Sequence, residues 1–150
     1  MKIDYLTVAI VNHMKKGRIR FKEIAEKLSV AEGTVRSRVR NLEQEGVLEV
    51  TGLVDPEKIP GQSMVYIGVK LKTIELVKKG EEISSVKGVI SVGVVTGRFD
   101  LILTVVLKTG FGLLEFYTEE LSQIDDIQSV EAFVVYKNYN IKIPCDECSI

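Results

Sequence analysis

The chain has 150 residues, 45% of them hydrophobic and 27% charged, with a formal net charge of −1, so it can bury a core as one domain or two small ones. No apolar run approaches the roughly 20 residues that span a bilayer, and the N-terminus lacks a signal-peptide cleavage pattern. We therefore expect a soluble cytoplasmic protein that is not membrane-bound.

The first predicted element is a helix near the N-terminus, with Asp4 in its first turn and an end at residues 15–17. Its apolar stripe at helical spacing consists of Tyr5, Leu6, Ala9, Ile10 and Met14. His13, the only histidine in the chain, falls on the polar side of this helix. We expect it to be a surface residue, because the sequence supplies no neighbour for it to make chemistry with.

Residues 21–47 predict two short amphipathic helices joined by a tight turn, which is a helix-turn-helix. The apolar stripes of the two helices are Phe21, Ile24, Ala25 and Leu28 in the first and Val35, Val39 and Leu42 in the second. Residues 29–31 form the turn between them. With the first helix, these segments make a three-helix unit of the winged helix-turn-helix type.

The face opposite the second stripe carries cations, hydroxyls and an amide but no acid. It consists of Thr34, Arg36, Ser37, Arg38, Arg40 and Asn41. Arginine can neutralise phosphates or pair bidentately with guanine, and Thr, Ser and Asn can reach base edges or backbone oxygens. These residues are therefore candidates for binding double-stranded DNA, although a charged helix face can also be simply solvated.

The local charge favours the DNA-binding interpretation. Residues 15–40 hold nine Lys or Arg against three Glu, a balance of +6 in a chain whose net charge is −1. A positively charged patch on a nearly neutral chain indicates an anionic partner that binds at that patch, rather than charge that only serves solubility.

The stretch IAEKLSVAEGTVRSRVRNLEQEGVL resembles the DNA-binding segment of the Lrp/AsnC (leucine-responsive and asparagine-responsive, feast/famine) regulators. The strongest match is RVRNLEQEGV at residues 38–47, which is similar to the family's R-[IV]-x-x-L-E-x-x-G-[IV] run. Where the family usually caps the second and third helices with Ser or Thr, this chain has Arg20 and Ala31, and Gly33 lies in the first turn of the third helix. A missing cap costs roughly 1 kcal/mol, so packing must hold these helix ends.

A linking segment is predicted after the helix-turn-helix. Residues 48–54 favour a strand, the Asp55-Pro56 pair marks a turn, and residues 59–61 form a joint, which places the domain boundary near Pro60. The expected organisation is residues 1–47 for DNA binding, 48–62 for a linking strand and hinge, 63–143 for effector sensing and oligomerisation, and 144–150 for a tail. In the resembled family such a strand helps to pair two subunits.

Residues 63–143 predict the element order βαββαβ. The strands are expected at residues 64–71, 89–96, 101–107 and 130–139, and the helices at 74–86, interrupted by Gly80, and along a stripe within 114–124. This order is typical of a ferredoxin-like sandwich with four antiparallel strands and both helices on one face, so the whole chain is predicted to be α+β. The uncovered sheet face predicts a homodimer or a higher even-numbered homo-oligomer.

This half also resembles the Lrp/AsnC family, whose C-terminal domain has that fold and senses amino acids. The match is Thr96, Gly97, Arg98, Phe99 and Asp100, similar to the family's T-G-x-[YF]-D turn, together with a looser match at residues 124–127. The resemblance implies that Gly97, Arg98, Phe99 and Asp100 line an effector pocket between dimers.

The residues of this turn support two interpretations. Gly97 admits a positive φ, and the opposite charges of Arg98 and Asp100 could bind the carboxylate and ammonium of an amino acid. The turn could equally be a hairpin in which Asp100 is a cap and Arg98 is solvated. Many family members carry two hydroxyl residues in the last strand near the ligand, whereas this chain has Val130 and Ala132. Either the effector differs or none is sensed.

Cys145 and Cys148 form a CxxC pair, which is half of a four-ligand zinc site and also a redox pattern. One chain supplies no second pair. A site shared between the tails of two chains is one alternative, but we expect a disordered tail and no metal site.

The sequence thus predicts a sequence-specific transcription regulator of the Lrp/AsnC type, with an amino acid as candidate effector and no cofactor. One alternative is an architectural DNA-binding protein without an effector. Another is a tetrapyrrole-modifying enzyme of the same architecture, which is disfavoured because the chain has no histidine after His13 and no paired carboxylate motif.

Overall fold

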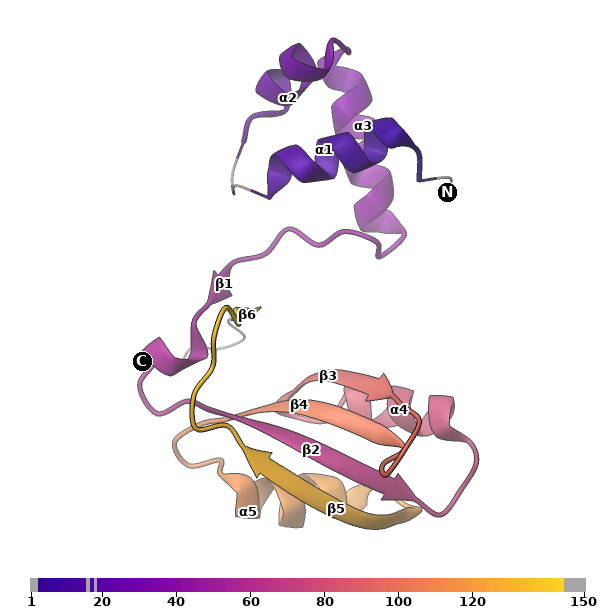
Figure 1. The fold of residues 1–150 in the computed structure, drawn as a ribbon, viewed down its shortest axis with the longest axis vertical. Helices are drawn as coiled ribbons and strands as arrows, with labels where there is room; N and C mark the ends of the chain where they lie inside the picture. The colour runs from indigo at the N-terminus through magenta and orange to yellow at the C-terminus, as the bar shows by residue number, and fades with distance from the viewer. Residues whose placement is uncertain (1–2, 16, 18, 145–150) are drawn as a thin grey trace. The chain divides into compact units, whose positions relative to one another are not determined.

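The computed structural model describes residues 3–15, 17 and 19–144 (Figure 1). The chain forms two compact units, which divide between Thr51 and Gly52. The joint predicted near Pro60 therefore lies within the second unit. None of the helices in the described part of the chain is long and apolar enough to cross a membrane.

The first unit is built from α1 (Tyr5–Met14), α2 (Phe21–Leu28) and α3 (Glu32–Gln44), which confirms the predicted helix-turn-helix. Its core consists of buried residues from all three helices: Ile10, Ile24, Ala25, Val35 and Val39. Tyr5 of the predicted α1 stripe is 89% exposed and does not belong to this core. Ser29 ends α2 in the left-handed conformation with φ 54°, and this sharp turn brings α3 across α2.

The helix starts differ in how they are capped. Asp4 caps α1 by accepting the Thr7 backbone N–H at 2.9 Å. Arg20 and Ala31 precede α2 and α3 and make no side-chain cap, as the sequence predicts. Buried apolar side chains of α2 and α3 hold these two helices in place instead.

The linking segment forms less strand than predicted. Only Leu53–Val54 is a strand, β1, which pairs antiparallel with β6 (Ile143–Pro144). Residues 48–52 lack regular structure because no second strand pairs with them in the described part of the chain, and a strand needs backbone partners. The Asp55-Pro56 pair opens a short 3-10 helix, η1 (Pro56–Lys58), which Asp55 caps.

The second unit contains a four-stranded sheet of β2 (Ser63–Leu71), β3 (Val89–Val94), β4 (Leu101–Leu107) and β5 (Ile127–Val134). The spatial order is β3-β4-β2-β5, and every neighbouring pair is antiparallel. The helices are α4 (Leu76–Ser84) and a helical segment made of α5 (Leu113–Glu115), the π-helical η2 (Phe116–Glu120) and the 3-10 turn η3 (Leu121–Gln123). The predicted ferredoxin-like βαββαβ order is confirmed.

Several elements of this unit depart from their predicted limits, and α4 and the last strand differ most. α4 covers Leu76–Ser84 rather than residues 74–86, and it runs without interruption through Gly80, which is buried beside Val92, Val94 and Leu101. The last strand begins at Ile127 and ends at Val134, earlier than the predicted 130–139. Val134 is the last residue of β5 that pairs with β2, and the chain then leaves the sheet to form β6.

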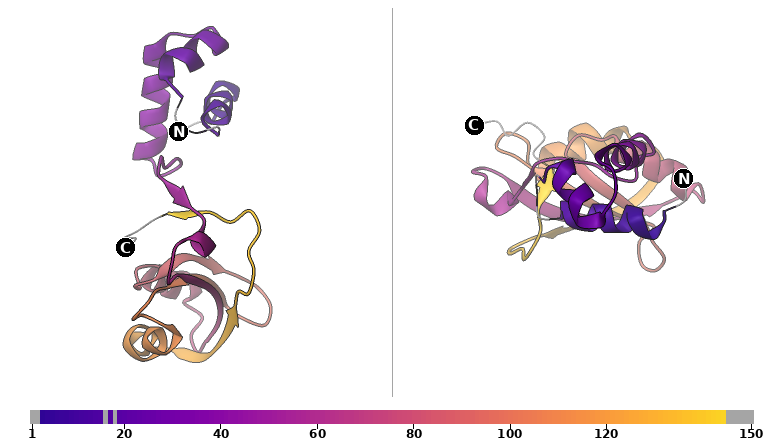
Figure 2. Two further views of the ribbon diagram at one scale, coloured as in Figure 1. Left: turned by 90° about the vertical axis from the view of Figure 1, so that its left-hand side faces the viewer. Right: turned by 90° about the horizontal axis from the view of Figure 1, so that it is seen from above.

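Both helical segments cover the same face of the sheet (Figures 1 and 2). This face buries alternate residues of β2 and β4 against Ile83 of α4 and Phe116 of η2. One end of the opposite face is covered by a smaller cluster around Met64, Val106 and Ile143. The rest of that opposite face, which we call the open face, carries Phe133 with 45% of its surface exposed.

Ile67 tests the contribution of the helix-covered core. Its side chain is fully buried, so Ile67→Ala should lower the free energy of unfolding by about 2–5 kcal/mol. Ile74→Ala is the matched control, because Ile74 is 96% exposed and its truncation should change stability by less than about 0.5 kcal/mol. Urea denaturation followed by circular dichroism measures both. Equal stability of the two variants would contradict this description of the core.

Candidate nucleic-acid interface and ligand-binding turn

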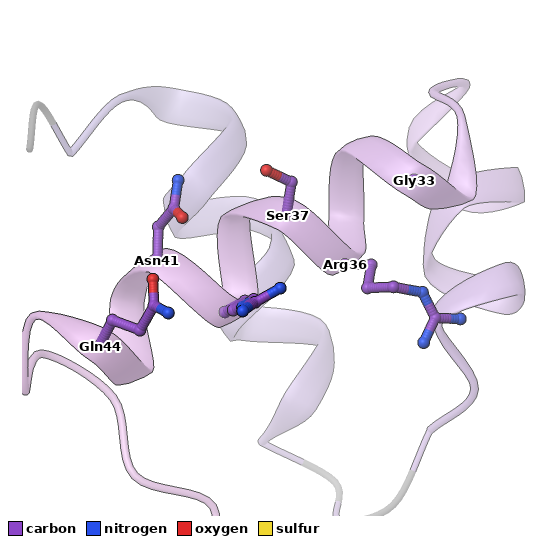
Figure 3. Close-up of a pocket in the computed structure, with 6 residues that line it drawn as sticks. Gly33, Arg36, Ser37, Asn41 and Gln44 are labelled. Carbon is purple, nitrogen blue, oxygen red and sulfur yellow. The ribbon is translucent and has the colours of Figure 1, made fainter.

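The exposed face of α3 is hollowed into a shallow pocket (Figure 3). Because Val35, Val39 and Leu42 are buried, the opposite side of the helix is left outside. The residues that line this hollow, which we call the α3 pocket, are Gly33, Arg36, Ser37, Arg40, Asn41 and Gln44. The structure therefore brings together Arg36, Ser37, Arg40 and Asn41 of the predicted DNA-binding residues.

Gly33 and Gln44 also line the α3 pocket, and the sequence prediction did not include them. Helical spacing could have found them, because Gly33, Arg36, Arg40 and Gln44 follow one another at intervals of three or four residues. Gly33 has nothing within 4 Å of the position where a Cβ would lie, so its small size leaves the pocket open at that end.

Arg36 is held in place within its own unit. Its Nη2 donates to a carboxylate oxygen of Glu32 at 2.5 Å, and its guanidinium carbon lies 5.5 Å from the ring centre of Phe21. The Arg36 side chain is still largely exposed, and an exposed ion pair of this kind contributes little to stability. A phosphate or a guanine edge can therefore replace Glu32 as its partner.

Arg38 and Thr34 do not line the α3 pocket. The Nη1 of Arg38 donates to Asp4 Oδ1 at 2.6 Å and to Thr7 Oγ1 at 2.7 Å, so its guanidinium group is directed at the start of α1. Thr34 is exposed on the first half of α3. The contact of Arg38 could not be predicted from sequence patterns, because Asp4 is 34 residues away along the chain.

One carboxylate oxygen of Asp4 accepts three hydrogen bonds. Besides Arg38, both the backbone N–H and the hydroxyl of Thr7 donate to its Oδ1, at 2.9 and 2.8 Å. The Thr7 N–H, followed by the guanidinium of Arg38, lowers the pKa of Asp4 from 3.8 to about 2. The carboxylate is thus held in its charged form.

The predicted effector turn, residues 96–100, folds back over the open face of the sheet. Gly97 has φ 130°, a conformation that favours glycine. The Phe99 ring lies directly on Gly68 of β2, where a Cβ would be only 2.6 Å from the ring. The same ring makes an edge-to-face contact with Phe133 of β5, with centroids 6.1 Å apart. The turn is therefore packed on the sheet rather than freely solvated.

The two charged residues of the turn have different partners. Arg98 donates to Glu131 Oε2 at 2.7 Å and lies over the Phe99 ring, while 76% of its side chain stays exposed. Asp100 accepts from the Leu71 backbone N–H and from Lys70 Nζ, both at 2.8 Å. The Leu71 N–H, then Lys70, lowers the pKa of Asp100. Asp100 thus holds the turn against β2, and Arg98 is the cation of the turn that a ligand from solvent can reach.

Sequence reasoning missed the partners of this turn: Gly68, Lys70, Glu131 and Phe133. All four belong to β2 or β5, and only the strand register brings them beside the turn. Within the residues that the structure describes, no group of three or more His, Cys, Asp or Glu could hold a metal ion. Cys145 and Cys148 lie outside the described residues.

Comparison with known proteins matches both units to described domains. Residues 64–142 match the Lrp/AsnC ligand binding domain, and residues 3–49 match a winged helix-turn-helix DNA-binding domain. An uncharacterised HTH-type transcriptional regulator from Pyrococcus horikoshii is 30% identical over 90% of this chain and 87% of its own. The regulatory protein AsnC of Haemophilus influenzae is 27% identical over 91% of this chain and 93% of its own.

Solved structures show the same fold. AsnC of Escherichia coli superposes with a TM-score of 0.71 at 23% identity, covering 92% of this chain and 95% of that one. A feast or famine regulatory protein from Mycobacterium tuberculosis, complexed with L-methionine, has a TM-score of 0.71 at 18% identity, with the same coverage of 92% and 95%.

The lowered pKa of Asp4 predicts acid sensitivity of the first unit. Because the pKa in the folded chain lies below the ordinary value, ionised Asp4 stabilises the fold fully above about pH 4, and this contribution is lost as the pH falls toward about 2. Asp4→Asn should therefore lower stability at neutral pH and flatten the pH dependence between those values. Urea denaturation at a series of pH values measures this.

The matched control for this prediction is Glu26→Gln, which removes an exposed carboxylate of α2. It should keep the pH dependence of the unaltered chain. If Asp4→Asn keeps that dependence as well, the hydrogen bonds to Asp4 do not stabilise the folded state.

Proposed function

The chain belongs to the Lrp/AsnC family of transcriptional regulators, and we propose that it binds operator DNA through the α3 pocket and responds to an amino acid or related molecule at the 96–100 turn. The family's members regulate transcription, and we propose no enzymatic activity. As a DNA-binding regulator, the protein would act in the cytoplasm.

The α3 pocket is the observation that carries the DNA-binding part of the proposal. An α-helix with its side chains is about 10–12 Å across and fits the major groove, which is about 12 Å wide. Arg36 and Arg40 would bind phosphates or guanine, while Ser37 and Asn41 would reach base edges or backbone oxygens. Thr34 would contact the DNA backbone beside them. Each bidentate pair adds about 1–3 kcal/mol of discrimination between bases.

A symmetric oligomer would present two or more such helices to half-sites of one operator. The open face of the sheet supports this part of the proposal, because an exposed aromatic residue such as Phe133 is the kind of group that a partner subunit covers. We propose a homodimer or a higher even-numbered homo-oligomer.

The pair of Arg98 and Glu131 supports an amino-acid effector. A free amino acid carries a carboxylate, which could replace Glu131 as the partner of Arg98. Its ammonium group could replace Arg98 as the partner of Glu131. Phe99 and Phe133 would then contact its side chain. L-methionine in the related structure from M. tuberculosis is a ligand of this chemical class.

One observation favours a second candidate, an architectural DNA-binding protein without an effector. Both charged residues of the turn already have partners within the chain, Glu131 for Arg98 and Lys70 for Asp100. Val130 and Ala132 also replace the hydroxyl residues that many family members have nearby. Such a protein would bind DNA with steep salt dependence and hardly any sequence preference.

Arg40→Ala tests the DNA-binding proposal. Fluorescence anisotropy on the DNA upstream of the protein's own gene should show binding weakened by about 5- to 150-fold, the equivalent of one lost bidentate contact. Lys78→Ala, which removes an exposed cation of α4, should bind as the unaltered chain does. Equal binding to scrambled DNA would favour the architectural protein, and no binding to any DNA would contradict both.

Gly68→Ala tests the effector proposal. Because a Cβ on Gly68 would meet the Phe99 ring at 2.6 Å, the ring and the 96–100 turn must move, and amino-acid binding measured by calorimetry should fall at least about tenfold. Gly93→Ala is the matched control. Gly93 lies in the same cross-strand row of the sheet, and a Cβ there would meet other atoms only at 3.9 Å.

Arg98→Gln should also abolish the effect of the amino acid on DNA binding while leaving binding without the amino acid unchanged. If a pool of amino acids neither binds the unaltered chain nor changes its affinity for DNA, the effector proposal fails and the architectural protein is favoured.

A further inference from the structure

We propose that Arg38 is a positioning residue that fixes the recognition helix α3 on the start of α1, and that it does not contact DNA. The inference rests on the proposed DNA binding by the α3 pocket. The sequence alone suggests the same role for Arg36, Arg38 and Arg40, whereas this proposal gives Arg38 a different role from the other two.

The helical wheel places Arg38 beside the buried stripe. A helix turns about 100° per residue, so Arg38 lies about 60° from Val35, whereas Arg40 lies about 140° from it. Val35 is fully buried, and only 31% of the Arg38 side chain is exposed. The Arg38 side chain thus lies at the edge of the packed side of α3, whereas the Arg40 side chain lies on the opposite side of the helix.

The acceptors of Arg38 belong to a fixed structure. Thr7 is 2% exposed, and both its N–H and its hydroxyl are bonded to Asp4, which caps α1. Arg38 binds Asp4 at 2.6 Å and Thr7 at 2.7 Å, so one nitrogen links α3 to the first turn of α1. A guanidinium group that swung out to DNA would give up both of these hydrogen bonds, although the Asp4 side chain, which is 42% exposed, could then be hydrated.

The two possible roles of Arg38 make opposite predictions for Asp4→Asn. If Arg38 contacts a phosphate, removing Asp4 frees the cation and deletes a nearby negative charge, so DNA binding should become tighter. If Arg38 positions α3, removing Asp4 loosens the helix that carries the α3 pocket, so binding should become weaker. The sign of the change distinguishes these roles.

Salt dependence provides a second distinction. Each phosphate contact contributes about 0.9 to the slope of log affinity against log salt concentration. Loss of a positioning residue changes affinity without removing a phosphate contact, so the slope should stay the same. Arg40→Ala provides the reference for a residue of the α3 pocket.

The experiment measures binding of the full chain to the upstream DNA by anisotropy at several salt concentrations, with circular dichroism to confirm folding. Asp4→Asn and Arg38→Gln should each weaken DNA binding on the order of tenfold. The double variant should bind DNA as tightly as the single variant with the lower affinity, because each of the three variants loses the same interaction between Arg38 and Asp4. The salt slopes should equal that of the unaltered chain.

Thr7→Val keeps the backbone N–H that Asp4 accepts and removes only the hydroxyl, so it is the second test if Asp4→Asn does not fold. It should weaken binding with an unchanged salt slope, and Thr7→Ser, which keeps the hydroxyl, should restore binding. Tighter binding by Asp4→Asn, or a salt slope lowered by about 0.9 in Arg38→Gln, would overturn the proposal.

The controls separate failure of this inference from failure of the proposed function. If Arg40→Ala weakens binding while Asp4→Asn, Thr7→Val and Arg38→Gln do not, Arg38 has no positioning role and the α3 pocket stands. If the unaltered chain binds no DNA, the proposed function and the role of Arg38 fail together.

Discussion

The burial of one stripe of α3 constrains everything else in the first unit. Once Val35 and Val39 enter the core, the helical period decides which of the remaining residues face outward. Arg36 and Arg40 are left on the outer side, and Arg38 falls at the border, within reach of α1. Three arginines at alternate positions of one helix therefore occupy different surroundings, although their chemistry is the same.

The elements with strong periodicity could be predicted from the sequence, and their long-range contacts could not. The three helices and the βαββαβ order follow from apolar spacing alone, because that spacing decides which side of an element is buried. Residues 48–52 have strand-like composition but pair with no second strand among the residues that the structure describes, so propensity alone was misleading there. Gly80 signals a helix break by itself, yet it lies on the buried side of α4, where packing on the sheet outweighs the weak helix propensity of one glycine.

The same limit applies to the candidate sites. Helical spacing predicted the outer face of α3, and the resemblance to the family's T-G-x-[YF]-D turn indicated residues 96–100, because each of these patterns lies within a short stretch of the chain. It could not locate Glu131 beside Arg98 or Lys70 beside Asp100, because those pairs depend on the register of β5 and β2. Any ligand that binds Arg98 at this turn must therefore interact with it more favourably than Glu131 already does.

The pairing of β1 with β6 has a mechanical consequence. β1 directly follows the division between the units, and its partner strand comes at the far end of the second unit's chain. β1 pairs with Ile143, and Ile143 is buried in the cluster with Met64 and Val106 on the sheet. The point at which the chain enters the second unit is therefore held on the sheet of that unit by strand pairing and by apolar contact, since Val54 also packs against this cluster.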